Sequence, residues 1–207
     1  MIRAITISRE YGSGGGSLAQ ILAEQLQWRL VDAALVQKIA EKARVDPSVA
    51  EQFDERVDPW FHRLNKALWL GGFEGMASRV EGEGFDADAM AALCRRVIEE
   101  SAGLGSCIIV GRGGQCILQK RPDVFHVSLY APLPERIKRL NERFPPGTNV
   151  AALAAETDRI RAAYIRHYHD VAWTDRHLYD LMICTTIGLH AAASIILLAA
   201  GLDNKSR

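Results

Sequence analysis

The first 27 residues combine a short β-branched run, a glycine-rich turn and an amphipathic helix, and no other feature constrains the fold of this chain as strongly. Residues 2–8 (IRAITIS) predict a buried strand, and the glycine run GSGGGS begins four residues later at Gly12. Apolar residues then recur at helical spacing over residues 17–27: Leu18, Ile21, Leu22 and Leu26. A strand, a glycine loop and a helix in this order begin a βαβ unit, so we expect a parallel sheet.

Four further apolar runs predict strands, which makes five in all: 28–31 (WRLV), 107–110 (CIIV), 124–130 (VFHVSLY) and 181–184 (LMIC). Helical patterns separate these strands or fill the region after the second one: 33–43, 47–55, 59–70, 86–102, 134–143, 150–169 and 189–201. Strands that alternate with helices are typical of a parallel sheet that is covered on both faces. The sequence therefore predicts a three-layer α/β protein with a five-stranded parallel sheet.

The length of 207 residues fits a single domain, and the charge balance argues against one class of function. Lys plus Arg and Asp plus Glu both number 25, so the chain lacks the positive field of proteins that bind nucleic-acid polymers non-specifically. The cysteines form no CxxC pair and the N-terminus shows no secretory leader, which predicts a cytoplasmic protein with reduced thiols. The longest apolar run, 191–202, is too short to span a bilayer and predicts a buried helix. We expect neither a nucleic-acid polymer nor a membrane as partner, and the oligomeric state stays open.

The glycine run has the composition of an anion-binding loop. Backbone N–H groups of such a loop converge at the start of a helix, where the dipole favours negative charge, and glycine lets the backbone approach a phosphate closely. We expect the cradle to be formed by consecutive residues: Gly12, Ser13, Gly14, Gly15, Gly16 and Ser17. The Ser17 hydroxyl, in the first helical turn, is placed to ligate a magnesium ion that is otherwise held by nucleotide phosphates and water.

The loop departs from the Walker A pattern GxxxxGK[ST]. When Ser17 takes the last position, with Gly16 as the extra glycine of helix-opening variants, Gly15 stands at the lysine and Arg9 at the first glycine. The phosphate-bridging lysine is therefore absent. Arg9 is the candidate to replace its charge, and a surface ion pair with Glu10 is the alternative for this arginine. A flexible turn without any ligand is the alternative for the glycines.

The same segment also fits a dinucleotide-binding loop. Gly12-x-Gly14 follows a predicted strand, and Asp32 lies about 20 residues further on, where an acidic side chain can hold a ribose. The arginine-rich segments downstream have no role in that scheme. We therefore rank dinucleotide binding third, behind the two functions considered below.

Further motifs extend the pattern along nearly the whole chain: ITISREYGSGG at 5–15, Asp32, DERV at 54–57, IIVGRGG at 108–114, ERIKRL at 135–140, DRIRAAYIRHYH at 158–169 and YDLMICTT at 179–186. In this ordered combination the sequence resembles the cytidylate kinase-like family of P-loop nucleoside monophosphate kinases. Two places differ from the usual family pattern. Gly16 and Ser17 stand where a basic and an acidic residue are usual, and Cys184 precedes Thr185 where an asparagine is usual.

The resemblance implies a single P-loop NTPase-like domain with three parts. The core would comprise residues 1–32, 106–132 and 167–207, a helical insert at 33–105 would bind the acceptor, and a short lid would lie at 133–166. The implied activity is ATP-dependent phosphorylation of a nucleoside monophosphate, with CMP or dCMP favoured and Mg²⁺ as the cofactor of ATP. ATP and a nucleoside monophosphate are thus the expected partners.

Phosphoryl transfer needs positive charge around both phosphate chains, and arginines are the available candidates. Arg112 follows the third predicted strand, at the edge where ligands of such sheets collect, and by the resemblance it would hold the acceptor monophosphate. Asp32 would organise the acceptor or a magnesium ion, with a helix N-cap as the alternative. The expected catalytic cations are Arg9, Arg139, Arg159 and Arg161. The missing lysine motivates a second hypothesis, a regulatory or interaction module that binds nucleotide without useful transfer.

Overall fold

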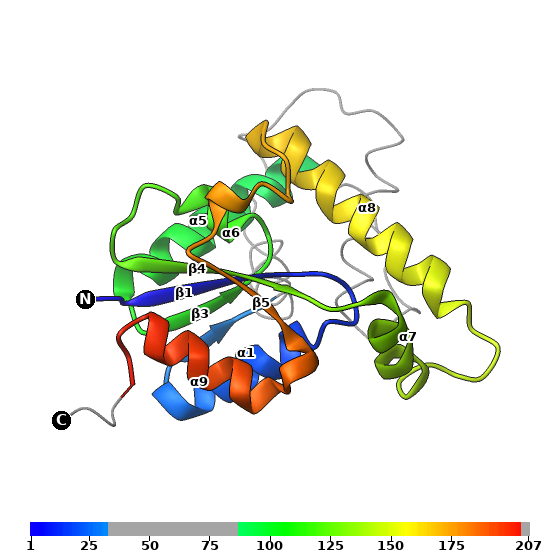
Figure 1. Ribbon diagram of the computed structural model, residues 1–207. Helices are drawn as coiled ribbons and strands as arrows, with labels where there is room; N and C mark the ends of the chain where they lie inside the picture. The colour runs from blue at the N-terminus through cyan, green and yellow to red at the C-terminus, as the bar shows by residue number, and fades with distance from the viewer. Residues whose placement is uncertain (33–86, 204–207) are drawn as a thin grey trace, which may run out of the picture.

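The computed structural model of the chain describes residues 1–32 and 87–203, which form one five-stranded sheet flanked by helices (Figure 1). The strands lie in the order β2-β3-β1-β4-β5, and every neighbouring pair is parallel. Their bounds are Ala4–Arg9 for β1, Arg29–Val31 for β2, Cys107–Val110 for β3, Val124–Tyr130 for β4 and Leu181–Cys184 for β5. The predicted five-stranded parallel sheet is confirmed.

The position of β3 distinguishes this fold from the dinucleotide-binding alternative. In a Rossmann sheet the second strand lies beside the first, in the order 3-2-1-4-5-6. Here β3 lies between β2 and β1, so β1 occupies the centre of the sheet with β3 on one side and β4 on the other. The Rossmann interpretation of the glycine run is therefore wrong.

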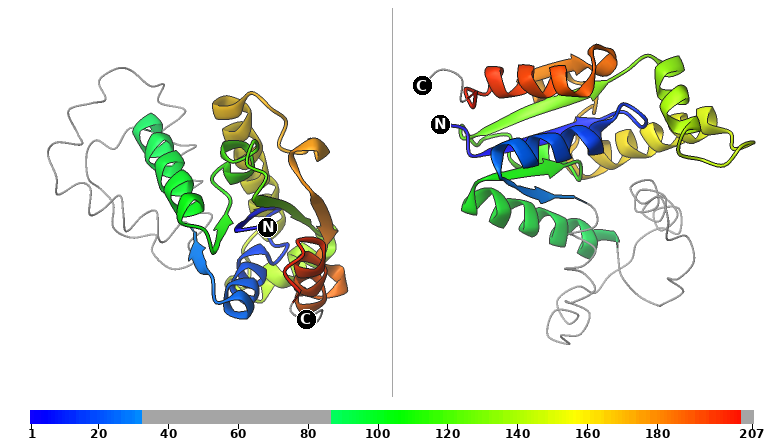
Figure 2. Two further views of the ribbon diagram at one scale, coloured as in Figure 1. Left: turned by 90° about the vertical axis from the view of Figure 1, so that its left-hand side faces the viewer. Right: turned by 90° about the horizontal axis from the view of Figure 1, so that it is seen from below.

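Helices cover both faces of the sheet, with α1 and α9 on one face and α5 and α6 on the other (Figures 1 and 2). The bounds of the described α-helices are Gly15–Leu26 for α1, Ala87–Leu104 for α5, Gly114–Ile117 for α6, Leu133–Asn141 for α7, Val150–His169 for α8 and Leu189–Ala199 for α9. Their predicted counterparts agree to within two residues at each end. The four-residue helix α6 was not predicted, because it is too short to show a helical period. The helices expected at 33–43, 47–55 and 59–70 lie outside the described residues.

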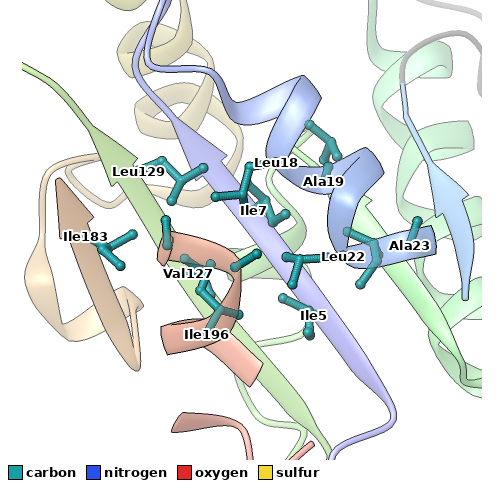
Figure 3. Packing of buried hydrophobic residues seen from close by; sticks show 14 residues of the cluster. Ile5, Ile7, Leu18, Ala19, Leu22, Ala23, Val127, Leu129, Ile183 and Ile196 are labelled. Carbon is teal, nitrogen blue, oxygen red and sulfur yellow. The ribbon is translucent and has the colours of Figure 1, made fainter. Parts of the chain in front are cut away.

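The larger core lies between the sheet and the pair α1–α9. Ile5 and Ile7 of β1 point to this side and pack with Leu18 and Leu22 of α1 and with Ile196 of α9 (Figure 3), and all five side chains are fully buried. Successive strand residues point to opposite faces, and both faces of this strand are covered, so Ala4 and the hydrogen-bonded Thr6 and Ser8 are buried on the other face. This is why β1 forms a continuous buried run instead of an alternating one.

The second core lies on the opposite face, under α5. Ala4 of β1 and Ile109 of β3 pack there against Met90, Cys94 and Ile98 of α5. Helix α5 is the last part of the insert expected at 33–105, and it forms one of the three layers of the domain. The boundaries of the insert and of the expected lid stay predictions.

Helix α9 contains the apolar run that the sequence predicts to be buried. Only one side of it is covered: Ala192, Ala193 and Ile196 are buried, whereas Ile195 and Leu198 are exposed. Among the described helices, none has the length and apolar character that crossing a bilayer requires.

The carboxyl ends of β1, β3 and β4 meet at one edge of the sheet, where ligands of α/β proteins bind. Ile7 of β1 lies beside Val110 of β3 and Val127 of β4. The segments that follow β1 and β3 therefore leave the sheet side by side, and the Gly111 N–H donates to the carbonyl of Ile7 at 3.0 Å. The pair α7–α8 projects beyond this same edge (Figure 1).

Candidate active site

The turn after β1 requires glycine at two positions. Gly12 and Gly14 have φ angles of 80° and 86°, in the left-handed region that side chains avoid. A Cβ on Gly12 would lie 3.0 Å from the Arg136 carbonyl oxygen, and one on Gly14 would lie 2.9 Å from the Leu189 side chain. Gly14 is also the N-cap of α1, so the turn leads directly into the helix.

Three contacts hold the turn in this shape. The Ser13 hydroxyl donates to the Glu10 carbonyl at 2.8 Å, and the Ser13 carbonyl accepts from Thr185 Oγ1 at 2.7 Å and from Arg139 Nη1 at 3.0 Å. Arg139 also donates to Thr185 through both terminal nitrogens. The end of β5 and helix α7 thus fix the backbone that precedes α1.

The beginning of α1 is oriented to accept an anion. The first amides of any helix lack partners within that helix and carry the positive end of its dipole. In α1 these amides belong to Gly15, Gly16 and Ser17, and the latter two residues are exposed. Arg143 of the segment after α7 adds a cation, because its Nη2 lies 3.5 Å from the Ser17 hydroxyl. A helix start with exposed amides and a nearby cation is chemically suited to a polyphosphate.

The pair α7–α8 is tied to the turn by a buried ion-pair network. Arg136 Nη1 lies 2.7 Å from Asp158 Oδ2 and 3.1 Å from Glu10 Oε2, and the Arg136 side chain is only 7% exposed. Asp158 Oδ1 accepts the Tyr11 N–H at 2.8 Å. The ion pair described for Glu10 is therefore with Arg136 and not with Arg9.

A small cavity, here called the arginine pocket, opens beside the turn after β3. The described residues that line it are Ser8, Arg9, Gly111, Arg112, Gly113, Gln115, Arg161, Tyr164, Ile165 and Trp173, and none of these is acidic. Three arginines therefore line one cavity, from β1, from the turn after β3 and from α8. The cavity volume is about 40 Å³. A water molecule needs roughly 10–15 Å³ of such space, so the enclosed part of the pocket is large enough for one phosphoryl group.

The turn after β3, which places Arg112 at the pocket, has an unusual backbone. Gly111, Arg112 and Gly113 have φ angles of 72°, 55° and 73°. A non-glycine residue in the left-handed region costs energy, and such strain tends to occur at functional sites. A Cβ on Gly113 would lie 2.5 Å from His169 Nε2, so α8 packs closely against the turn.

Burial and mutual repulsion make the pocket electrostatically unusual. Burial lowers the pKa of Arg9 well below its ordinary value, and the charges of Arg161 and Arg112 lower it further, against the opposite influence of Asp158 and Asp32. Burial likewise lowers the pKa of Arg161 to about 10. An anionic ligand would relieve this repulsion and favour the charged guanidinium groups.

The structure brings together most, but not all, of the residues expected to act. Arg9, Arg112 and Arg161 share the pocket, and Arg139 lies at the glycine turn. Arg159 lies outside the pocket, because it stands two positions from Arg161 on α8 and points to another side of the helix. There it pairs with exposed Glu156.

Asp32 follows β2 directly and lies within electrostatic reach of Arg9. The helix that it would cap lies outside the described residues, so that alternative stays a prediction.

Ser17 is the expected magnesium ligand next to the glycine turn. Within the described part of the chain no group of three or more His, Cys, Asp or Glu residues is placed to hold a metal. The exposed Ser17 hydroxyl at the first turn of α1 fits a single ligand of an ion that nucleotide phosphates and water otherwise hold.

Four polar or aromatic residues of the pocket were not predicted: Ser8, Gln115, Tyr164 and Trp173. Trp173 is fixed on both sides, because its indole N–H donates to Ser8 Oγ at 2.7 Å and its carbonyl accepts from the Tyr179 hydroxyl at 2.7 Å. Burial raises the pKa of Tyr179 to about 12, so this phenol keeps its proton. A single tryptophan in a loop carries no pattern that would identify it from sequence.

The sequence profile of the cytidylate kinase-like family matches residues 4–187. The cytidylate kinase of Nitrosococcus oceani is 31% identical over 83 residues, which are 40% of this chain and 36% of that enzyme. The cytidylate kinase of Shewanella sediminis is 25% identical over 99 residues, which are 47% of this chain and 43% of that enzyme. The chain thus matches less than half the length of either relative.

Solved structures share the fold at lower identity. An uncharacterized protein from Eubacterium ventriosum is 21% identical with a TM-score of 0.69, and the match covers 99% of this chain and 100% of that one. Shikimate kinase from Acinetobacter baumannii is 18% identical with a TM-score of 0.52, over 100% of this chain and 97% of that one. A gluconokinase from Sinorhizobium meliloti is 12% identical with a TM-score of 0.54, over 96% and 91%. The chain therefore shares its three-layer fold with these proteins.

Proposed function

The chain belongs to the cytidylate kinase-like family, and we propose from this premise that it transfers the γ-phosphoryl group of ATP to a nucleoside monophosphate. CMP and dCMP are the favoured acceptors, because both relatives named above are cytidylate kinases. The single observation that carries the proposal is the arginine pocket beside the glycine turn. Three arginines line this pocket, and the pocket is large enough for a phosphoryl group. It lies near the N-terminus of α1, which is suited to bind a polyphosphate.

The residues divide between the two substrates. The amides at the start of α1 would bind the polyphosphate of ATP, and Arg139 and Thr185 would keep their turn in place. Arg112 and Arg161 would hold the monophosphate of the acceptor. Transfer consists mostly of positioning and charge neutralisation, which a fixed set of guanidinium groups supplies. Bound with ATP, Mg²⁺ would neutralise phosphate charge, and the Ser17 hydroxyl is the residue to hold it.

A second function has a specific observation in its favour. Gly15 stands at the Walker lysine, so a protein that binds nucleotide and fails to transfer phosphate is the competing candidate. A coupled assay of ADP release with CMP, dCMP, UMP, AMP and GMP separates the two. Turnover with one acceptor supports the kinase, and tight MgATP binding without turnover for any of them supports the binding module.

The role of Arg112 is tested by Arg112→Ala in the same assay. We expect the KM of the monophosphate to rise about tenfold to a hundredfold, the effect of losing one charge-assisted contact, with a smaller change for ATP. Lys120→Ala is the control, because this exposed cation lies outside the arginine pocket, the glycine turn and the expected insert. Equal losses for both substrates would contradict the assignment of Arg112 to the acceptor.

A further inference from the structure

The Arg9 side chain occupies the space that a side chain at position 15 would need. A Cβ on Gly15 would lie 2.7 Å from Arg9 Cγ and 2.8 Å from Arg9 Cβ. Distances under 3.0 Å do not occur for real Cβ atoms, and here the obstacle is the root of the arginine side chain, which cannot swing aside as its far end can. A side chain at position 15 and the arginine at position 9 therefore exclude one another in this conformation.

A second glycine makes room for the other end of Arg9. A Cβ on Gly111 would overlap Arg9 Nη1, and the guanidinium group lies in the arginine pocket with Arg112 and Arg161. The backbone of Arg9 is fixed as well, because its carbonyl accepts from Arg161 Nη1 at 2.9 Å. The side chain thus runs from the end of β1, past Gly15 and into the cavity.

The two positions are those that define a Walker A loop. In the pattern GxxxxGK the first position is glycine and the seventh is lysine, and in this chain they are Arg9 and Gly15. We propose that the loop carries a transposed cation: Arg9 supplies from the first position the charge that lysine ordinarily supplies from the seventh, and Gly15 is required because Arg9 fills its place. This inference rests on the proposed function and names the residue on which transfer depends.

The proposed role of Arg9 in the reaction is electrostatic stabilisation. An oxygen of the acceptor monophosphate forms a bond to the γ-phosphorus of ATP, the bond from that phosphorus to the β–γ bridging oxygen breaks, and its electron pair stays on the departing ADP. No proton is needed for the balance. Negative charge develops on the bridging and γ-phosphoryl oxygens, and a fixed guanidinium group at the junction of the two substrates stabilises it.

The test exchanges the two residues. Arg9→Gly removes the cation, Gly15→Lys adds a second side chain to an occupied space, and the double variant Arg9→Gly/Gly15→Lys recreates the ordinary loop. We expect each single variant to lower kcat about tenfold to a hundredfold, since each loses or displaces one charge-assisted contact. The kcat of the double variant should exceed that of the less active single variant by about tenfold or more. Two independent defects would instead lower kcat further when combined.

Matched controls separate this exchange from general effects. Ser194→Lys adds a lysine at an exposed position of α9, and Lys120→Ala removes an exposed cation that precedes β4; neither residue lies in the glycine turn, the arginine pocket, or the expected insert or lid. Both should leave kcat unchanged. If Gly15→Lys folds poorly, its melting temperature is compared with that of the double variant, which should be higher because the collision with Arg9 is gone. A double variant that is neither more active nor more stable than Gly15→Lys overturns the proposal.

Failure of the proposed function gives a different result. If the unaltered protein phosphorylates no monophosphate, the kinase assignment fails, and the exchange is judged by calorimetry with MgATP alone. Arg9→Gly should then weaken MgATP binding about tenfold or more, and the double variant should restore it. Equal affinity in the unaltered protein and all three variants refutes the transposed cation.

Discussion

Removing the Asp158 carboxylate should strongly destabilise the protein, because this group links α8 to both the glycine turn and α7. One oxygen accepts the Tyr11 N–H at 2.8 Å, and the other lies 2.7 Å from Arg136 Nη1. The Asp158 side chain is 17% exposed and that of Arg136 is 7% exposed. Asp158→Ala would therefore leave the buried Arg136 guanidinium group with Glu10 as its remaining carboxylate among the ion pairs described, and it would remove the carboxylate that lies 3.5 Å from Arg161 Nη1.

The size of the effect follows from these contacts. Truncating one partner of a buried ion pair costs roughly 3–5 kcal/mol, and the lower end of that range applies because Glu10 still lies 3.1 Å from Arg136. A loss of about 3 kcal/mol in a chain of this size lowers the melting temperature by about 6–12 °C. Asp158→Asn keeps an oxygen for the Tyr11 N–H and loses only the charge, so its effect should lie between those of Asp158→Ala and no change.

Urea unfolding and thermal melting of three variants test this reasoning. Glu156→Ala is the matched control on the same helix, since its pair with Arg159 is short but more than half exposed. Such exposed pairs contribute little, so Glu156→Ala should leave the melting temperature unchanged. If Asp158→Ala destabilises the protein no more than Glu156→Ala, the network does not anchor α8 as described.

Three further predictions concern other parts of the site and the core. Gly111→Ala should lower kcat in the unaltered protein and have a smaller effect in an Arg9→Gly background, where the guanidinium group it would displace is gone; equal effects in both backgrounds contradict this. Thr185→Val should raise the KM of ATP about tenfold, because the Ser13 carbonyl loses a buried hydroxyl donor, and unchanged kinetics would show that the turn holds without it. Burial lowers the pKa of His126 below the value of about 6.5 that it has when unfolded, so the unfolded chain binds the proton first as the pH falls. The free energy of unfolding should therefore decrease between pH 7.5 and 5.5, and His126→Gln should show a smaller decrease in urea titrations at the two pH values.

The strands and helices were predictable because each leaves a local pattern in the sequence. A covered parallel strand such as β1 is a short apolar run, and α8 shows a period that continues over 20 residues. The order β2-β3-β1-β4-β5 was not predicted, because strand pairing joins segments about 100 residues apart and no local pattern records it. That order nevertheless decides the site, since it brings the segments after β1 and β3 together.

The sequence predicted which residue types form the site better than which individual residues do. The candidate arginines were visible in the sequence, but helical spacing alone does not tell which side of α8 meets the cavity. Arg161 faces the pocket and Arg159 faces solvent, two residues apart. Arg136, three residues before Arg139 on α7, was not among the expected cations and is the buried centre of an ion-pair network. Burial and the placement of carboxylates decide these roles, and both depend on contacts distant in sequence.

In the structure, several glycines of the sequence motifs make space for side chains. A glycine-rich turn ordinarily indicates close approach of backbone to phosphate. Gly15 and Gly111 instead leave space for the two ends of Arg9, and Gly113 leaves space for His169. The absence of the Walker lysine is then one half of a paired arrangement, in which an arginine at the first position of the loop requires a glycine at the seventh. It follows that a lysine introduced at position 15 should be harmful while Arg9 is present and beneficial once Arg9 is removed, a reversal of sign that a merely degenerate loop would not produce.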